Sequence, residues 1–203
     1  LGLGGATVQG SINAGSGAVS GQVTANGSAP GSFGGVSATT THTDRLVNIS
    51  TRGLVGDGDK AMIAGFVISG SQSKSVLVRA SGPTLTGYGL SGAMDDPVLK
   101  IYRGQDVILS NDNWSTSADA SLIASTAARV GGFAQQSGSK DAALITSLTP
   151  GVYSAQVTRA DGSATGVALV EVYDASVAPG AEVQKVINIS TRGEVGTGEK
   201  IMI

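Results

Sequence analysis

One segment of this chain occurs twice. The run Asn-Ile-Ser-Thr-Arg-Gly at residues 48–53 returns at residues 188–193, an offset of 188 − 48 = 140 residues. The match continues through spaced Val, Gly, Lys and Met-Ile positions as far as residues 63 and 203, so a chance hexamer does not account for it. Self-similarity at a fixed period predicts a tandem array of folding units. We therefore expect one whole repeat of about 140 residues and the start of the next, as in a window on a longer array.

The composition favours a β protein with an aliphatic core. Hydrophobic residues make up 40% of the 203 residues, but only 4% are aromatic, and 31 residues are glycine. A core of Val, Ile, Leu and Ala in thin β-layers joined by Gly-rich turns fits these values. Each repeat is long enough to fold by itself.

Charge and hydropathy exclude several classes of partner. The net charge is −2, from 13 Lys and Arg against 15 Asp and Glu. No cluster of basic residues is present, so we expect no nucleic-acid partner. No apolar run is long enough to cross a bilayer, so we expect no membrane span. The chain has no cysteine, which leaves its redox compartment open.

Residues 1–44 form a Gly/Ser-rich segment with short bursts of alternating apolar and polar residues, and Asn26-Gly27 is a hairpin signal between two of them. Two interpretations stay open for this segment. It is either a set of short strands that ends an upstream β-domain or a flexible linker.

Residues 45–183 predict an all-β domain, an antiparallel and jelly-roll-like β-sandwich with one short helix. Alternating segments bounded by turn residues predict eight strands, at residues 46–50, 60–69, 75–80, 98–102, 106–109, 142–148, 152–159 and 167–173. Apolar residues at helical spacing predict a helix over Ser117–Val130, with a capping-box pattern at residues 116–119 and Gly131-Gly132 at its end.

Residues 184–203 repeat the first strand and the opening of the second. They begin the next repeat, or they act as an exchanged strand that pairs with a neighbouring copy, as in strand addition. The interface residues predicted on this basis are Asn188, Ile189, Ser190, Thr191 and Arg192.

Seven short runs carry a family likeness: NISTRG at 48–53, IAGFVISG at 63–70, VRASGPTL at 78–85, NDNW at 111–114, GSKDAAL at 138–144, LTPGVY at 148–153 and GVALVEVYD at 166–174. Together they resemble a poorly characterised tandem-repeat β-sandwich module of large secreted and surface proteins of bacteria. The second half is similar, more weakly, to pre-peptidase C-terminal domains, small β-sandwiches of which some bind calcium. The resemblance implies an extracellular or cell-surface location. It covers residues 45–183 and 185–203 and leaves residues 1–44 outside.

A cluster of acidic and amide residues is the strongest candidate for a metal site. Calcium prefers six to eight oxygen ligands from carboxylates, amides and carbonyls. A hairpin between residues 98 and 109 would bring such ligands together at its ends, from Asp95, Asp96, Asn111, Asp112 and Asn113. The alternative is turn chemistry, because Asp and Asn side chains satisfy local backbone donors in loops.

Residues for catalysis are sparse. His42 is the only histidine and lies outside the repeat, which excludes a Ser-His-Asp relay within it. Glu171 and Asp174 are close enough in the sequence to be considered as an acid/base pair. We do not expect them to act as one, because Glu171 lies in an alternating strand where its side chain should face solvent. Trp114, the only tryptophan, is either a sugar-stacking platform or, as we favour, a plug whose N–H bonds a loop carbonyl.

These features favour a structural role over an enzymatic one. We expect a repeat unit of an extracellular bacterial surface protein, a filament, sheath or stalk built by head-to-tail contacts between neighbouring copies. The alternative is an adhesive or carbohydrate-binding module, with calcium as its cofactor where one is needed. We expect no enzyme activity.

Overall fold

Short strands dominate the computed structural model, which describes residues 7–12, 18–24, 31–36, 46–160, 165–176 and 184–203. The chain divides into two compact units, Leu1–His42 and Thr43–Ile203. In the first unit, β1 (Thr7–Ile12), β2 (Ala18–Thr24) and β3 (Gly31–Val36) form an antiparallel sheet in the order β1-β2-β3. The described residues of this segment therefore form short strands, as in the first of the two interpretations. The Asn26-Gly27 hairpin signal and His42 lie outside the described residues.

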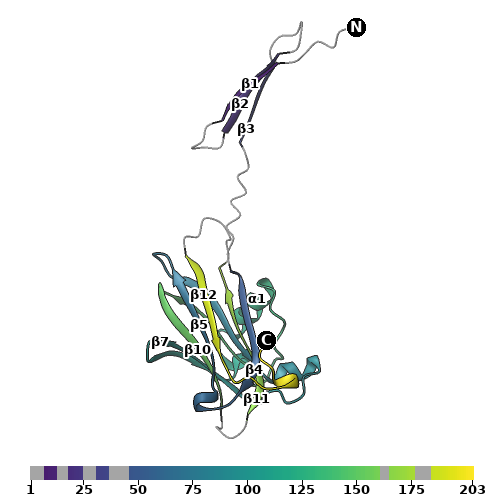
Figure 1. Ribbon diagram of the computed structural model, residues 1–203, viewed down its shortest axis with the longest axis vertical. Helices are drawn as coiled ribbons and strands as arrows, with labels where there is room; N and C mark the ends of the chain where they lie inside the picture. Colours follow the sequence, from purple (N-terminus) through teal and green to yellow (C-terminus); the bar gives the residue numbers. More distant parts are fainter. Residues whose placement is uncertain (1–6, 13–17, 25–30, 37–45, 161–164, 177–183) are drawn as a thin grey trace. The chain divides into compact units, whose positions relative to one another are not determined.

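The second unit is an antiparallel β-sandwich (Figure 1). One sheet has the order β4-β11-β6-β9 and the other the order β12-β5-β10-β7-β8. Without β12, this is the strand order of a jelly roll, in which successive strands mostly alternate between two four-stranded sheets. The strands are β4 (Asn48–Val55), β5 (Met62–Ser69), β6 (Lys74–Ser81), β7 (Pro97–Arg103), β8 (Asp106–Asn111), β9 (Ala142–Leu148), β10 (Gly151–Arg159), β11 (Gly166–Asp174) and β12 (Lys185–Arg192).

All eight strands predicted between residues 46 and 173 are present. The largest difference is at the first, which begins at Asn48 and continues to Val55. The second begins at Met62, because Gly58–Lys60 forms a short 3-10 turn (η1) in which Gly58 has a φ of 58°. Glycine adopts this left-handed conformation without steric cost.

The core lies between the two sheets and is aliphatic. Along β5 every second residue is buried, and the same alternation in β10 buries Tyr153, Ala155 and Val157. Alternation of this kind places one face of each strand against the opposite sheet. Phe66 and Tyr153 stack with ring centroids 5.6 Å apart and are the only stacked aromatic pair among the described residues.

A second, smaller core lies on the outer face of the β4-β11-β6-β9 sheet, under the helix α1 (Ala120–Arg129). Ile123 and Ala127 of the helix pack there with Leu77 and Tyr173 of the sheet. The helix ends at Arg129, and the predicted glycine stop follows it: Gly131 has a φ of +82°, and the Gly132 N–H donates to the Ala127 carbonyl. It begins later than predicted, at Ala120, because Ser117 Oγ accepts a hydrogen bond from the Asp119 N–H and holds a turn there.

The repeated segment occupies two places in the sandwich. β4 pairs with β11, whereas β12 pairs antiparallel with β5, from Lys185 opposite Ser69 to Arg192 opposite Ile63. β12 is therefore the fifth strand of the sheet that contains β5, and it lies beside β5 in Figure 1.

Candidate functional site

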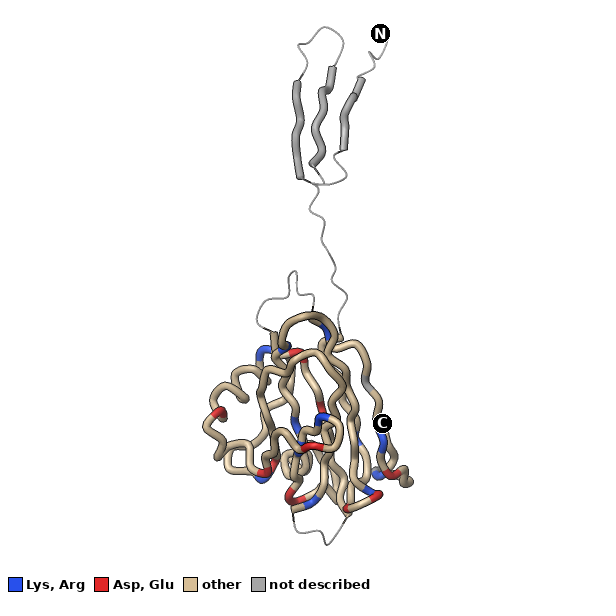
Figure 2. Tube along the Cα trace, turned by 90° about the vertical axis from the view of Figure 1, so that its left-hand side faces the viewer, with Lys and Arg blue, Asp and Glu red and all other residues tan. Residues whose placement is uncertain are grey.

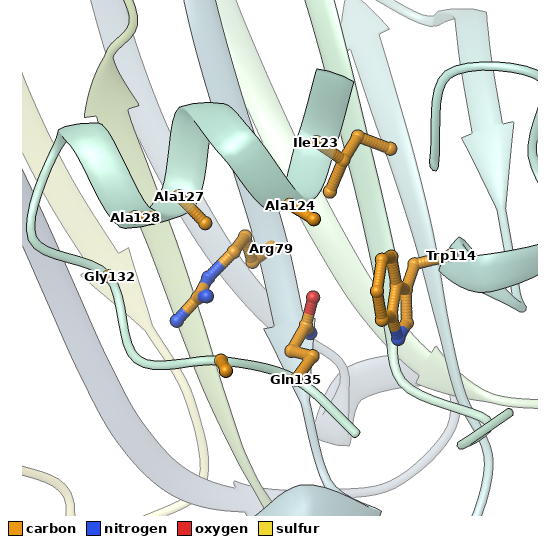
Figure 3. A pocket seen from close by; sticks show the side chains of 9 residues that line it. Arg79, Trp114, Ile123, Ala124, Ala127, Ala128, Gly132 and Gln135 are labelled. Carbon is orange, nitrogen blue, oxygen red and sulfur yellow. The ribbon is translucent and has the colours of Figure 1, made fainter. Parts of the chain in front are cut away.

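A small cavity lies between α1 and the sheet beneath it. Its volume is about 120 Å³, and Figure 3 shows the side chains of Arg79 and Gln135 below the helix, with Trp114 at one side. The helix contributes mainly Ala124, Ala127 and Ala128 to the lining, and these short side chains do not fill the space above the sheet. The lining residues are Arg79, Trp114, Ile123, Ala124, Ala127, Ala128, Gly132, Ala134 and Gln135.

Arg79 is fully buried at this cavity and all of its guanidinium nitrogens donate hydrogen bonds. Nε and Nη2 donate to Oε2 of Glu171, and Nη1 donates to the Phe133 carbonyl. The guanidinium carbon lies 4.4 Å from the centre of the Phe133 ring. Tyr173 donates its hydroxyl to Oε1 of Glu171 at 2.6 Å. Burial, together with the hydrogen bond to Glu171 and the charge of that residue, raises the pKa of Tyr173 well above its usual value. The arrangement is a closed ion pair with neutral partners around it.

The prediction that Glu171 faces solvent is wrong. Its side chain is only 4% exposed. β11 lies between β4 and β6, and its outer face is covered by the cluster under α1. An alternating pattern indicates a solvent face only when the sheet has one, and this part of the sheet is covered on both sides.

A second buried carboxylate, Asp141, joins two loops. It accepts hydrogen bonds from the Gly82 N–H at 2.7 Å, from the Thr84 N–H and hydroxyl, and from the Ser139 hydroxyl at 2.6 Å. Multiple donors of this kind stabilise a buried carboxylate. Asp141 therefore holds the turn after β6 against the loop before β9.

Lys74 and Asp174 form a third buried polar contact, with 2.9 Å between Nζ and Oδ2. Burial alone would raise the pKa of Asp174. The hydrogen bonds from Lys74 and Ser176 and the Lys74 charge together outweigh burial, and the pKa lies below its usual value. Glu171 and Asp174 are thus committed to different cations and do not form an acid/base pair.

The prediction that Trp114 is a buried ring whose N–H bonds a loop carbonyl is confirmed, although the ring lies under α1 and not between the two sheets. The ring is only 7% exposed, and Nε1 donates to the Gln136 carbonyl at 3.2 Å and to the Ser139 hydroxyl at 3.4 Å. Its neighbours in the cluster under α1 include Ile123 and Ala127.

The candidate calcium ligands have protein partners of their own. Asp95 contacts Arg159 at 3.4 Å and Asp96 contacts Lys140 at 2.5 Å. Asn111 Oδ1 accepts the Ala143 N–H at 3.0 Å, and its Nδ2 donates to the Asn113 carbonyl. The Asp112 side chain is exposed. Within the described part of the chain, no three or more His, Cys, Asp or Glu side chains come together as a metal site. Calcium binding stays a prediction.

The predicted interface residues lie in β12. Asn188, Ser190, Thr191 and Arg192 are opposite Val67, Gly65, Ala64 and Ile63 of β5, and Ile189 is opposite Phe66. Thr191 Oγ1 also lies 3.0 Å from Thr51 Oγ1, the equivalent atom of the first copy. Lys60 of the first copy contacts Glu194 of the second copy at 3.3 Å. The two copies of the repeated segment therefore touch each other.

Sequence reasoning did not find Arg79, Lys74 or Asp141 as members of buried polar clusters. A signal for Arg79 exists, because a charged residue within the apolar run Val76–Ala80 requires a buried partner. Nothing local identifies that partner, since Glu171 is 92 residues away in the chain.

Acidic and basic residues are interspersed over the sandwich, as Figure 2 shows. Among the described residues no helix is both long enough and apolar enough to cross a membrane. No family model, curated protein or solved structure matches this chain, so its function is argued from the geometry above.

Proposed function

We propose that this chain is a structural repeat unit of an extracellular bacterial surface protein. In this role, successive β-sandwiches are joined to one another and build a stalk, sheath or filament. The observation that carries the proposal is the pairing of β12 with β5, because the leading strand of one repeat completes a sheet of the repeat before it.

The fit of β12 on β5 supports a permanent junction. Val186 of β12 is buried, and burying a valine side chain stabilises by about 1.5–3 kcal/mol. Ser190 lies directly against Gly65 of β5. A Cβ added to Gly65 would come within 2.7 Å of the Ser190 hydroxyl oxygen. The strand therefore packs directly on its neighbour without intervening side chains at that point.

The buried polar clusters support a structural role rather than a catalytic one. The charged groups of Arg79, Glu171, Lys74 and Asp174 are buried and engaged with each other. Asp141 is engaged by the turn after β6 and the loop before β9. Groups held in this way fix the neighbouring loops to the sheet. The resemblance of the sequence to modules of bacterial surface proteins supports the extracellular location.

The test is electron microscopy of the full chain extended by further copies of residues 64–203, which continue the 140-residue period after Ile203. We expect straight stalks whose length grows in proportion to the number of copies. Flexible strings of separate beads would contradict the proposal. Binding of the unextended chain to a glycan array would favour the alternative of a carbohydrate-binding module.

A further inference from the structure

The two copies of the repeated segment have the same local structure. A 3-10 turn follows the strand in both, at Gly58–Lys60 (η1) and Gly198–Lys200 (η4). The φ angles of Gly58 and Gly198 are 58° and 62°. The N–H of Gly56 donates to the Lys60 carbonyl at 3.0 Å, and that of Gly196 to the Lys200 carbonyl at 3.0 Å. The second copy has therefore adopted the fold of the first without the rest of a repeat behind it.

The contacts between the two copies are related by a pseudo-twofold axis. Arg52 and Ile203 exchange backbone hydrogen bonds in both directions at 2.9 Å. The residue equivalent to Arg52 in the second copy is Arg192, and the residue equivalent to Ile203 in the first copy is Ile63. These two equivalents are also paired, in the register of β12 and β5. Residues on the axis contact their own equivalents, as Thr51 does Thr191 and as Leu54 does Glu194.

Side chains of the second copy lie exposed where those of the first are core. Val55 is 0% exposed, whereas its equivalent, Val195, is 68% exposed. Ala61 is 0% exposed and its equivalent, Ile201, is 42% exposed. In the first copy, Val55 lies opposite Gly166 of β11. The second copy presents apolar side chains at the same two positions, and among the described residues no strand equivalent to β11 lies against them.

One edge of the second copy's strand also remains open. Successive residues of a strand direct their backbone N–H and carbonyl groups to opposite edges. Arg52 directs its groups to Ile203, so Thr51 and Val55 direct theirs to β11. The twofold relation gives Arg192 the same role toward β5. Thr191 and Val195 then present their backbone groups on the side away from β5, and β12 is the edge strand of its sheet.

We propose that this edge takes β11 of its own repeat, the one that β12 begins, so that two successive repeats form a symmetric pair about the Thr51–Thr191 axis. The inference rests on the proposed function as a repeat unit and names its partner. The leading strand of each repeat pairs with β5 of the other repeat and with β11 of its own. Each sheet thus continues from one repeat into the next.

The pair closes on two copies. Each repeat offers one β4 edge and one β5 edge to this contact, and in the pair all four edges are used, as in an isologous interface. A third repeat cannot enter the same contact, so in a long array the junction of β12 with β5 would occur at every second boundary between repeats, and another surface would join one pair to the next.

The experiment extends the full chain after Ile203 by a copy of residues 64–183, which completes the second sandwich. Amide hydrogen exchange is then measured for residues 190–196 in the original and the extended chain. We expect the amides of Thr191 and Val195 to exchange about 100-fold more slowly in the extended chain, because they gain β11 as a partner. Unchanged exchange at these amides would overturn the pairing, even if electron microscopy showed the repeats to be joined in stalks.

A second variant tests the axis itself in the unextended chain, which has no cysteine. Thr51→Cys with Thr191→Cys should form a disulfide on mild oxidation, since the two hydroxyl oxygens are 3.0 Å apart. The matched control is Thr51→Cys with Ser190→Cys, because Ser190 lies over Gly65 on the other face of β12 and should stay reduced. Free thiols in both variants would overturn the twofold contact.

Discussion

At the scale of single residues, buried charges connect two neighbouring strands of the β4-β11-β6-β9 sheet. Arg79 and Lys74 lie on the same strand, and their partners Glu171 and Asp174 lie on the neighbouring strand, so two ion pairs tie β6 to β11. A charge transferred from water to a protein interior loses several kcal/mol of solvation, and only a well-placed partner compensates that loss. The pairs therefore specify how β6 and β11 meet, more than they add net stability.

Removal of one partner of such a pair should be far more costly than removal of both. We expect Arg79→Met to lower the free energy of unfolding by about 3–5 kcal/mol, because it leaves Glu171 buried without its cation. The double variant Arg79→Met with Glu171→Met should lose less than the single variant. Urea unfolding of the three proteins checks this. A single variant within about 0.5 kcal/mol of the original, the range of most surface substitutions, would contradict the role assigned to the pair.

The Lys74–Asp174 pair predicts the response to acid. The pKa of Asp174 is lowered in the folded chain from its usual 3.8. Its contribution to stability is therefore fully present above that value and is lost as the pH falls from there through the folded pKa. Asp174→Asn should be less stable at pH 7, since Lys74 is left buried without its anion. The variant should also show a smaller decline in stability between pH 4 and pH 2, as urea unfolding at each pH would show. An equal decline in both proteins would assign the acid sensitivity to other groups.

At the scale of elements, alternation of apolar and polar residues was sufficient to predict the eight strands of the sandwich, and helical spacing was sufficient for α1. It failed for Glu171, because the pattern cannot distinguish a solvent face from a face that another layer covers. It also left the partners of Arg79 and Asp141 unidentified. Their hydrogen bonds join residues more than 50 positions apart, and no local rule reports which loops a fold brings together.

Two glycines show how closely the elements approach one another. A Cβ added at Gly82, after β6, would lie 2.3 Å from the Met94 carbonyl oxygen, and one at Gly166, in β11, would lie 2.6 Å from the Met94 Cα. The loop that contains Met94 is therefore held between two points that have no room for a methyl group.

We expect Gly82→Ala and Gly166→Ala each to lower the free energy of unfolding by about 1–3 kcal/mol, as for other cases of overpacking. Gly87→Ala is the matched control, because the nearest atom to its added Cβ would be the side-chain nitrogen of Gln136 at 3.4 Å, an ordinary contact. Thermal unfolding of the three variants provides the comparison. Equal melting temperatures for all three would show that the loop moves to accept the methyl group.

At the scale of the whole molecule, the repeat was visible in the sequence, but its pairing was not. The same hexamer pairs with β11 in the first copy and with β5 in the second. A strand has two edges, and a sequence pattern specifies which face is apolar but not which edge meets which neighbour. Only the surroundings of each copy decide this, and here they place the two copies side by side.

The last prediction follows from the position of β12 at the edge of its sheet. A chain that ends at residue 183 would leave β5 as an open edge and remove the buried Val186. The loss of that side chain alone corresponds to about 1.5–3 kcal/mol, or a decrease of roughly 3–12 °C in the melting temperature of a chain of this size. A synthetic peptide of residues 184–203 should bind the shortened chain and restore the melting temperature, because strand addition needs only the open edge and a matching strand. A peptide of the same composition in scrambled order should not. The contrary outcome is a shortened chain that melts at the original temperature and binds neither peptide. In that case β12 does not stabilise the sandwich, and the junction between repeats must lie elsewhere.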